Sequence, residues 1–278
     1  MGIEARQRAG GHPATRAPRH TARSTRTGLA PQRVMRITVL GSGDAFGAGG
    51  RFHSAYLCEV AGATFLLDCG PSILQAAKQV AWDLGKLDAV LLTHLHGDHF
   101  GGVPFLFMEY RYETPRTRPF AIYGPDGTER RVKALFAALY EHTATEPLPF
   151  PVEYHELAAG QAVELGAARV TALPVHHVPE LTAFAYRVEV EGRTFLYSGD
   201  TAWTDELAAH ARGVDLFVCE CSTFETRLDI HISYPEIAAR AAELGCRRLV
   251  LSHLGSEPLR RLDEVSLECA RDGMTLDL

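Results

Sequence analysis

Short apolar runs that alternate with helix-like segments constrain the fold of this chain more than any other feature. From residue 35 onward, β-branched runs predict strands at 35–40, 55–60, 63–68, 87–92, 119–123, 169–175, 183–190, 193–198, 214–219 and 247–252. Helical patterns lie at 71–80, 101–109, 127–141, 203–211, 234–244 and 258–271. Short turns containing Gly62 and Gly192 indicate two hairpins. Since the later strands alternate with helices, we expect an α+β fold of mixed sheets covered by helices.

The first 33 residues differ in composition from the rest of the chain. They hold seven of the 28 basic residues and one of the 34 acidic residues, so residues 34–278 keep 21 basic and 33 acidic side chains, a net charge of −12. Such a segment cannot bury enough apolar surface to fold. It is a disordered arm, a transit peptide, or the product of a start placed too early, with Met35 as the true beginning; we favour the last. Residues 34–278 are expected to form one domain.

The composition limits the classes of protein to which this chain can belong. An apolar fraction of 46% is ordinary for a globular chain. No run approaches the roughly 20 apolar residues of a membrane helix, and the start of the sequence lacks the apolar core of a secretory signal. The six cysteines are scattered along the chain, which favours reduced thiols. We therefore expect a soluble cytoplasmic protein.

A histidine-rich turn follows the apolar run at 87–92. His94, His96, Asp98 and His99 place three imidazoles and a carboxylate within six residues. Neutral imidazole and ionised carboxylate are ligands for divalent metals, and functional residues concentrate where strands end in loops. The pattern predicts a metal site, with a helix cap or a solvated loop as the alternative.

This His-x-His-x-Asp-His pattern after a strand resembles the defining motif of the metallo-β-lactamase superfamily, over residues 35–278. The resemblance implies an αββα sandwich of two mixed sheets flanked by helices, with metals at one edge. It implies further ligands at His177, Asp200 and His253, with His176 as the alternative to His177. The two implied sites are His94, His96, His177 and Asp200 for the first metal, and Asp98, His99, Asp200 and His253 for the second. Such nitrogen and oxygen ligands suit two divalent ions, Zn²⁺ first and Mn²⁺ or Fe as alternatives.

The resemblance also points to hydrolysis by a hydroxide that bridges the two metals. The family's redox branch usually carries a carboxylate where this chain has His96. Glu220 and His231 resemble a pair in the ribonuclease Z branch, in which a glutamate orients a histidine that protonates the leaving group. The branch's His-Glu-Ala-Thr segment is altered here around Glu220, for which a purely structural role is the alternative. With Asp98, this pair forms the predicted catalytic set.

Two features favour a small substrate over a large RNA. His177 and Asp200 are only 23 positions apart, in a region where ribonucleases Z usually carry a long arm that grips transfer RNA. The acidic body disfavours nucleic acid, which binds mostly to basic surfaces. We predict a phosphodiesterase acting on a small phosphodiester or nucleotide; a lactone or thioester (acyl) hydrolase with the same metal site is the alternative. Relatives also imply a homodimer.

Two flanking segments have supporting roles in this prediction. The Gly-rich stretch at 40–47 resembles the family's first motif, with Asp44 as support, because a lone Gly-x-Gly is weak evidence for nucleotide binding. Four aromatic residues follow the histidine motif and either line a pocket or pack in the core. Their spacing favours the core for Phe105, Phe107, Tyr110 and Tyr112.

Overall fold

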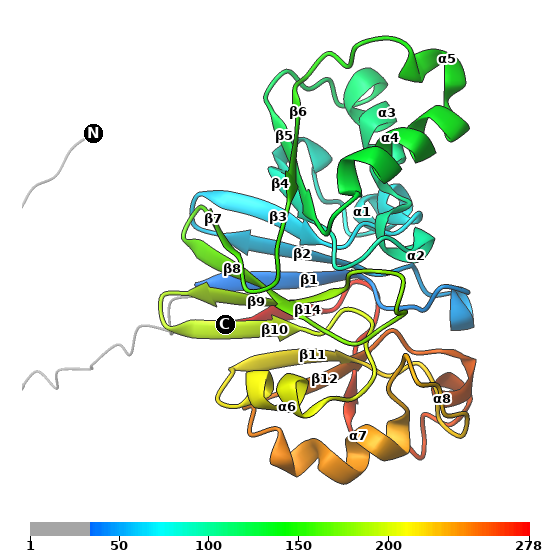
Figure 1. Cartoon of the computed structure of the whole chain (residues 1–278), viewed down its shortest axis with the longest axis vertical. Helices are drawn as coiled ribbons and strands as arrows, with labels where there is room; N and C mark the ends of the chain where they lie inside the picture. Colours follow the sequence, from blue (N-terminus) through cyan, green and yellow to red (C-terminus); the bar gives the residue numbers. More distant parts are fainter. Residues whose placement is uncertain (1–33) are drawn as a thin grey trace, which may run out of the picture. The chain divides into compact units, whose positions relative to one another are not determined.

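Two mixed β-sheets of seven strands each form the centre of the computed structural model, which describes residues 34–278 (Figure 1). The first sheet has the order β14 (Thr275–Asp277), β1 (Met35–Gly41), β2 (Ala55–Val60), β3 (Ala63–Leu67), β4 (Ala89–Leu91), β5 (Phe120–Gly124) and β6 (Val152–Glu156). The second has the order β13 (Glu268–Cys269), β12 (Leu249–Ser252), β11 (Leu216–Glu220), β10 (Arg193–Tyr197), β9 (Phe184–Val190), β8 (Ala168–Pro174) and β7 (Ala162–Leu165). The predictions made for residues 1–33 lie outside the described residues.

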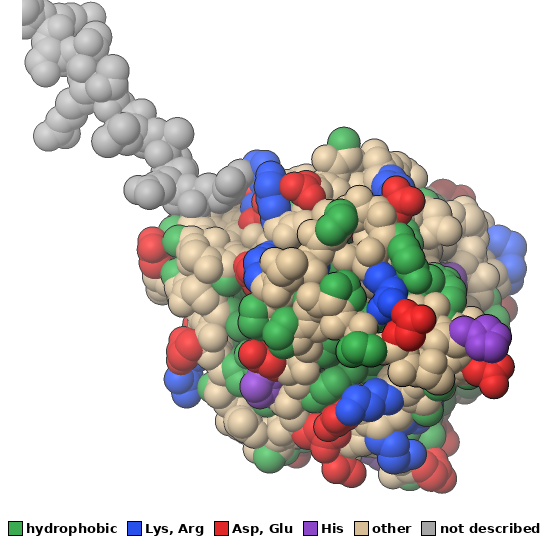
Figure 2. Space-filling view, turned by 90° about the horizontal axis from the view of Figure 1, so that it is seen from above, with side chains coloured by type: hydrophobic (Ala, Val, Ile, Leu, Met, Phe, Trp, Pro, Cys, Tyr) green, Lys and Arg blue, Asp and Glu red, His purple; other side chains and the backbone are tan. Residues whose placement is uncertain are grey.

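Helices cover the outer face of each sheet. They are α1 (Ile73–Gln79), α2 (Gly97–Phe100), α3 (Val103–Tyr112), α4 (Thr128–Leu139), α5 (Glu141–Ala144), α6 (Asp205–Ala211), α7 (Tyr234–Arg240) and α8 (Ser256–Arg260). Seen from above in Figure 2, the surface mixes apolar and charged side chains. Within residues 34–278, no helix combines the length and apolar character needed to cross a membrane.

Alternating side chains divide the apolar core into three layers. In β3, Phe65 packs between the two sheets, whereas Leu66 faces the layer formed with α1, α3 and α4. In β10, Phe195 packs between the sheets and Leu196 faces α6 and α7. Successive residues of a strand point to opposite faces, so each strand serves two layers. This arrangement confirms the predicted αββα sandwich.

Both predicted hairpins are present. β2 pairs with β3 and β9 pairs with β10, each antiparallel. Gly62 has φ +82°, and the second turn places Glu191 at φ +47° and Gly192 at φ +79°. In the second turn, positive φ at both central residues gives the backbone a twist that matches that of the two paired strands.

The four strands that the sequence analysis missed are the four edge strands of the two sheets. β6, β7, β13 and β14 are two to five residues long, and most of their residues are exposed or only partly buried. A strand at a sheet edge needs neither a long apolar run nor strict alternation. The pattern that revealed the ten inner strands is therefore absent from these four.

The helix predicted over 258–271 is wrong. The structure has α8 at Ser256–Arg260, turns after it, and β13 at Glu268–Cys269. Val265, Leu267 and Cys269 pack against the core at a two-residue spacing, which is the period of extended chain and not of a helix. Pairing of Val250 with Glu268 adds a strand to the sheet edge and overrides the local helical pattern.

Arg116 anchors the segment from which the histidine-rich turn projects. Its side chain is 4% exposed, and its guanidinium donates to the carbonyls of Leu87, Arg118 and Pro119. It also lies over the rings of Tyr110 and Phe120, 5.0 and 5.1 Å from their centroids. One buried cation thus ties the chain before β4 to the chain before β5.

We expect Arg116→Ala to lower the free energy of unfolding by about 3 kcal/mol, because it removes three hydrogen bonds to backbone carbonyls and the packing of a buried guanidinium on two rings. Arg169→Ala is the control, since the ion pair of Arg169 with Glu164 is exposed and contributes less than about 1 kcal/mol. Urea denaturation measures both. Equal losses in the two variants would rule out an anchoring role for Arg116.

Candidate metal centre

Seven predicted ligands meet where strands of both sheets end. His94, His96 and His177 offer ligand atoms within 4.8 Å of one another, and so do Asp98, His99, Asp200 and His253. The histidine-rich turn follows β4; the other three residues follow β8, β10 and β12. Parallel strands run side by side from β3 to β6 and from β10 to β13, so their carboxyl ends bring distant residues to one edge.

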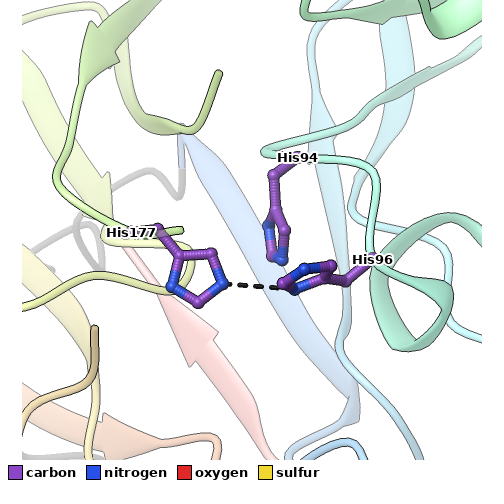
Figure 3. Close-up of side chains that lie close together, drawn as sticks. All are labelled: His94, His96 and His177. Atoms are coloured by element: carbon purple, nitrogen blue, oxygen red, sulfur yellow. Dashed lines mark hydrogen bonds between the residues drawn. The ribbon is translucent and has the colours of Figure 1, made fainter. Parts of the chain in front are cut away.

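The first group consists of three imidazoles that point toward one another (Figure 3). Ring centroids lie 4.7 Å apart for His94 and His96, 4.9 Å for His94 and His177, and 5.0 Å for His96 and His177. His96 Nδ1 and His177 Nε2 are 3.2 Å apart. Such convergence of nitrogen atoms fits a cation held on three sides.

The second group combines two carboxylates and two imidazoles. His99 Nε2 lies 3.2 Å from both Asp98 Oδ2 and Asp200 Oδ1. His253 Nε2 lies 3.3 Å from Asp98 Oδ2 and 3.4 Å from Asp200 Oδ1. Asp200 Oδ2 is 3.9 Å from His94 Nε2, so this carboxylate faces both groups.

The Nδ1 atoms of four histidines have partners outside the two groups, so that Nε2 faces the cluster. His177 Nδ1 donates to the carbonyl of Ile230 at 2.9 Å, and His99 Nδ1 lies 2.7 Å from the Asp68 carboxylate. His94 Nδ1 lies 3.0 Å from a threonine hydroxyl, and His253 Nδ1 lies 2.9 Å from a serine hydroxyl. Metal-binding histidines are oriented by such partners on the opposite ring nitrogen.

Three buried atoms of the cluster have no hydrogen-bond partner among residues 34–278: His94 Nε2, His99 Nε2 and Asp200 Oδ1. Buried polar atoms are normally paired, so each of these requires an explanation. A divalent cation accepts electron pairs from neutral imidazole and from carboxylate and would satisfy all three. The residues therefore fit a metal.

The electrostatics of the first group favour uncharged imidazole. Burial lowers the pKa of His94, His96 and His177, most strongly at His94. Burial alone would raise the pKa of Asp98 and Asp200, but neighbouring histidines hold both pKa values below the usual range. Neutral imidazole in the first group and ionised carboxylate are the forms in which these side chains bind metals, whereas the same carboxylates oppose the effect of burial and raise the pKa of His99 and His253.

The structure separates the two candidate histidines at 176 and 177. The side chain of His177 is buried in the first group. His176 is exposed, and its backbone carbonyl accepts from the N–H of Ala202. Only His177 is placed to serve as a ligand.

Asp68 is a supporting residue that the sequence analysis missed. Its carboxylate is fully buried after β3 and accepts hydrogen bonds from the backbone N–H and hydroxyl of Thr93, the hydroxyl of Tyr197 and the imidazole of His99. A carboxylate directly after the apolar run 63–67 was the available signal. Asp68 orients His99 and Thr93, the first residue of the turn, together.

Glu220 and His231 form a hydrogen-bonded pair beside the cluster. Glu220 is 1% exposed, and its Oε1 lies 2.8 Å from His231 Nδ1. The N–H groups of Thr201 and Ile232 and the hydroxyl of Ser222 also donate to this carboxylate. Burial lowers the pKa of His231, but the charge and hydrogen bond of Glu220 raise it to about 9.

Ser222 joins this pair to the second group. Its hydroxyl donates to Glu220 Oε2 at 2.9 Å and accepts from His253 Nδ1 at the same distance. In the sequence, Ser222 is one of the departures from the ribonuclease Z pattern around Glu220. Its hydroxyl connects His253 to the carboxylate that holds His231.

Two residues of the site have backbone angles that non-glycine residues rarely adopt. Asp68 has φ +61° and His253 has φ +54°. Left-handed backbone at such residues is maintained only where surrounding contacts impose it, and it is concentrated at functional sites. Both carry side chains that face the cluster.

The Gly-rich stretch at 40–47 borders the site. Asp44 Oδ1 accepts from the N–H groups of Phe46 and Ala48, which orders the turn as the sequence analysis expected of a supporting residue. The turn presents Ala45 and Phe46 to the hollow that contains Asp98, Asp200 and His253.

Comparison with known proteins agrees with this architecture. The model of the beta-lactamase superfamily domain matches residues 63–254. A ribonuclease Z of Mycobacterium bovis is 31% identical over 240 residues, which cover 79% of this chain and 86% of that protein. The metallo-beta-lactamase fold protein YhfI from Bacillus subtilis superposes with a TM-score of 0.72 at 24% identity, covering 89% of this chain and all of YhfI. The human short-form tRNase Z superposes with a TM-score of 0.69 at 24% identity, covering 87% of this chain and 98% of that one. By sequence match and by fold, this chain belongs to the metallo-β-lactamase superfamily, in its ribonuclease Z-like branch.

Proposed function

We propose that this protein is a metal-dependent phosphodiesterase whose clustered ligands hold two divalent cations. The observation that carries the proposal is the position of the Glu220–His231 pair: Glu220, His231 and His253 offer ligand atoms within 4.8 Å of one another. A histidine held by a buried carboxylate beside a metal centre is placed to give a proton to a leaving group. Relatives named ribonuclease Z support the same reaction class.

Each of the two ligand groups would hold one ion. His94, His96 and His177 would hold the first, and Asp98, His99 and His253 the second. Asp200 would serve both, because its two oxygens face His94 and His99. Zn²⁺ is the expected metal, with Mn²⁺ or Fe as alternatives, since the ligands are imidazole and carboxylate without thiolate.

Two bound cations supply a water-derived nucleophile at neutral pH and neutralise charge on a phosphate group. Asp98 belongs to the proposed catalytic set because, within the second group, it lines the same hollow as His231. His231 donates a proton from Nε2, because its Nδ1 is engaged with Glu220. Cations held by the neighbouring ligands would lower the pKa of His231 from about 9, because like charge disfavours its protonated form.

A small phosphodiester fits the surroundings better than a large RNA. The segment between His177 and Asp200 is occupied by the hairpin of β9 and β10, which pairs within the second sheet. No separate arm emerges there, and the body carries a net charge of −12. We therefore propose a nucleotide-sized substrate and, from the family resemblance, a homodimer.

We expect Asp200→Ala to reduce bound metal and to lower phosphodiester hydrolysis by more than about 100-fold, because losing even an outer partner of a metal ligand costs 10–100-fold. Metal content per chain and turnover of bis(p-nitrophenyl) phosphate measure the two effects. Asp263→Ala, at an exposed position away from the cluster, is the control. Full metal content and full turnover in Asp200→Ala would refute its place in the centre.

His231→Ala should slow substrates with poor leaving groups much more than substrates with good ones. A p-nitrophenolate leaves without protonation, whereas an alkoxide needs an acid, whose loss reduces the rate roughly 100-fold or more. The test compares kcat for bis(p-nitrophenyl) phosphate with kcat for a dinucleotide. Equal losses on both substrates would remove His231 from the acid role.

A further inference from the structure

Three adjoining hollows surround the metal centre. A central hollow of about 150 Å³ contains Asp98, Asp200, His231 and His253. It shares Ala45 and Asp98 with a mainly apolar groove of about 700 Å³. On the other side it shares Leu228 and His231 with a polar recess of about 310 Å³. The cluster thus lies between an apolar groove and a polar recess.

We propose that the apolar groove binds a planar aromatic group, an aryl ring or a nucleobase, on the half of the phosphodiester that keeps the phosphate. This inference rests on the proposed phosphodiesterase function and adds the identity of the retained group. The leaving group then lies on the side of His231.

The orientation follows from the position of the acid. The leaving oxygen must come within hydrogen-bond distance of His231, which lines both the central hollow and the polar recess. His253 lies between His231 and Asp98: its ring centroid is 5.7 Å from that of His231, and its Nε2 is 3.3 Å from Asp98 Oδ2. The groove opens beside Asp98, so it receives the substituent that does not leave.

The lining of the groove suits a flat ring. Phe100, Phe105, Leu135 and Leu139 form its apolar surface, and Leu139 is 46% exposed. The guanidinium of Arg131 lies 5.5 Å from the centroid of the Phe100 ring and makes no hydrogen bond or ion pair with any residue in 34–278. An aromatic group would cover exposed apolar surface there, and its polar edge would find unused donors.

Exposed apolar side chains gather around these hollows. Of the five large apolar side chains that stand exposed in residues 34–278, Phe46 lines the central hollow, Leu139 the groove, and Leu228 the two hollows next to His231. Phe46 is 91% exposed. Exposed apolar residues that cluster at a cavity mark a binding surface. The core role expected for the aromatic residues holds for Phe107 and Tyr110, whereas Phe105 lines the groove and Tyr112 is exposed.

The kinetic test uses two substrates with the same leaving group. Bis(p-nitrophenyl) phosphate retains an aryl group, and methyl p-nitrophenyl phosphate retains a methyl group. We expect the wild-type protein to prefer the aryl diester in kcat/KM, and Leu139→Asp and Phe105→Ala to reduce that preference at least five-fold. Leu262→Asp is the matched control, because Leu262 is 44% exposed but lies outside the three hollows.

A binding test is independent of turnover. Titration calorimetry of the metal-loaded protein compares AMP with ribose 5-phosphate, which lacks the base. We expect AMP to bind at least ten-fold more tightly, and Leu139→Asp but not Leu262→Asp to remove the difference. Equal affinities in the wild type, or an unchanged preference in both groove variants, would overturn the inference. Absence of turnover on both diesters with AMP still preferred would overturn the phosphodiesterase proposal and leave the groove assignment standing.

Discussion

The buried carboxylate of Asp68 is the contact on which the rest of the site depends. It follows β3 in the first sheet, accepts from Thr93 at the end of β4 and from Tyr197 at the end of β10, and holds the ring of His99. Two further hydrogen bonds join the sheets nearby: Tyr186 donates to the carbonyl of Leu92, and the hydroxyls of Tyr56 and Ser252 are paired. The sheets are thereby fixed relative to each other where both supply ligands, and a rigid scaffold is what a metal centre requires.

This scaffold holds an arrangement that is unfavourable without a partner. Imidazoles and carboxylates are buried together, three of their atoms are unpaired within the described chain, and His253 adopts a left-handed backbone. Each feature opposes folding by itself, and a bound cation offsets the first two. The surrounding hydrogen bonds, from Asp68 to Ser222, orient His99 and His253 within the cluster.

The sequence predicts the inner part of the molecule better than its edges. Ten inner strands and both hairpins are visible because buried strands need apolar residues and tight turns need positive φ. The edge strands and the end of the 258–271 segment are not predicted from the sequence, because most of them pair with a strand that is distant in the chain. For the same reason, family resemblance was needed to find His177, Asp200 and His253. Ser222 was missed because nothing local distinguishes a supporting hydroxyl from that of a turn residue, and Asp68 because a single carboxylate after an apolar run does not indicate which residues it supports.

The central claim, that this cluster is a metal centre for phosphodiester hydrolysis, is tested most directly by reconstitution. Metal-depleted protein is titrated with Zn²⁺, Mn²⁺ or Fe²⁺, and hydrolysis of bis(p-nitrophenyl) phosphate is measured beside a p-nitrophenyl acyl ester and a thioester. We expect phosphodiester cleavage to be absent without metal and to rise until two equivalents per chain are bound. Restoration of acyl ester or thioester cleavage alone would contradict it and would make Glu220 and His231 structural residues of an acyl hydrolase.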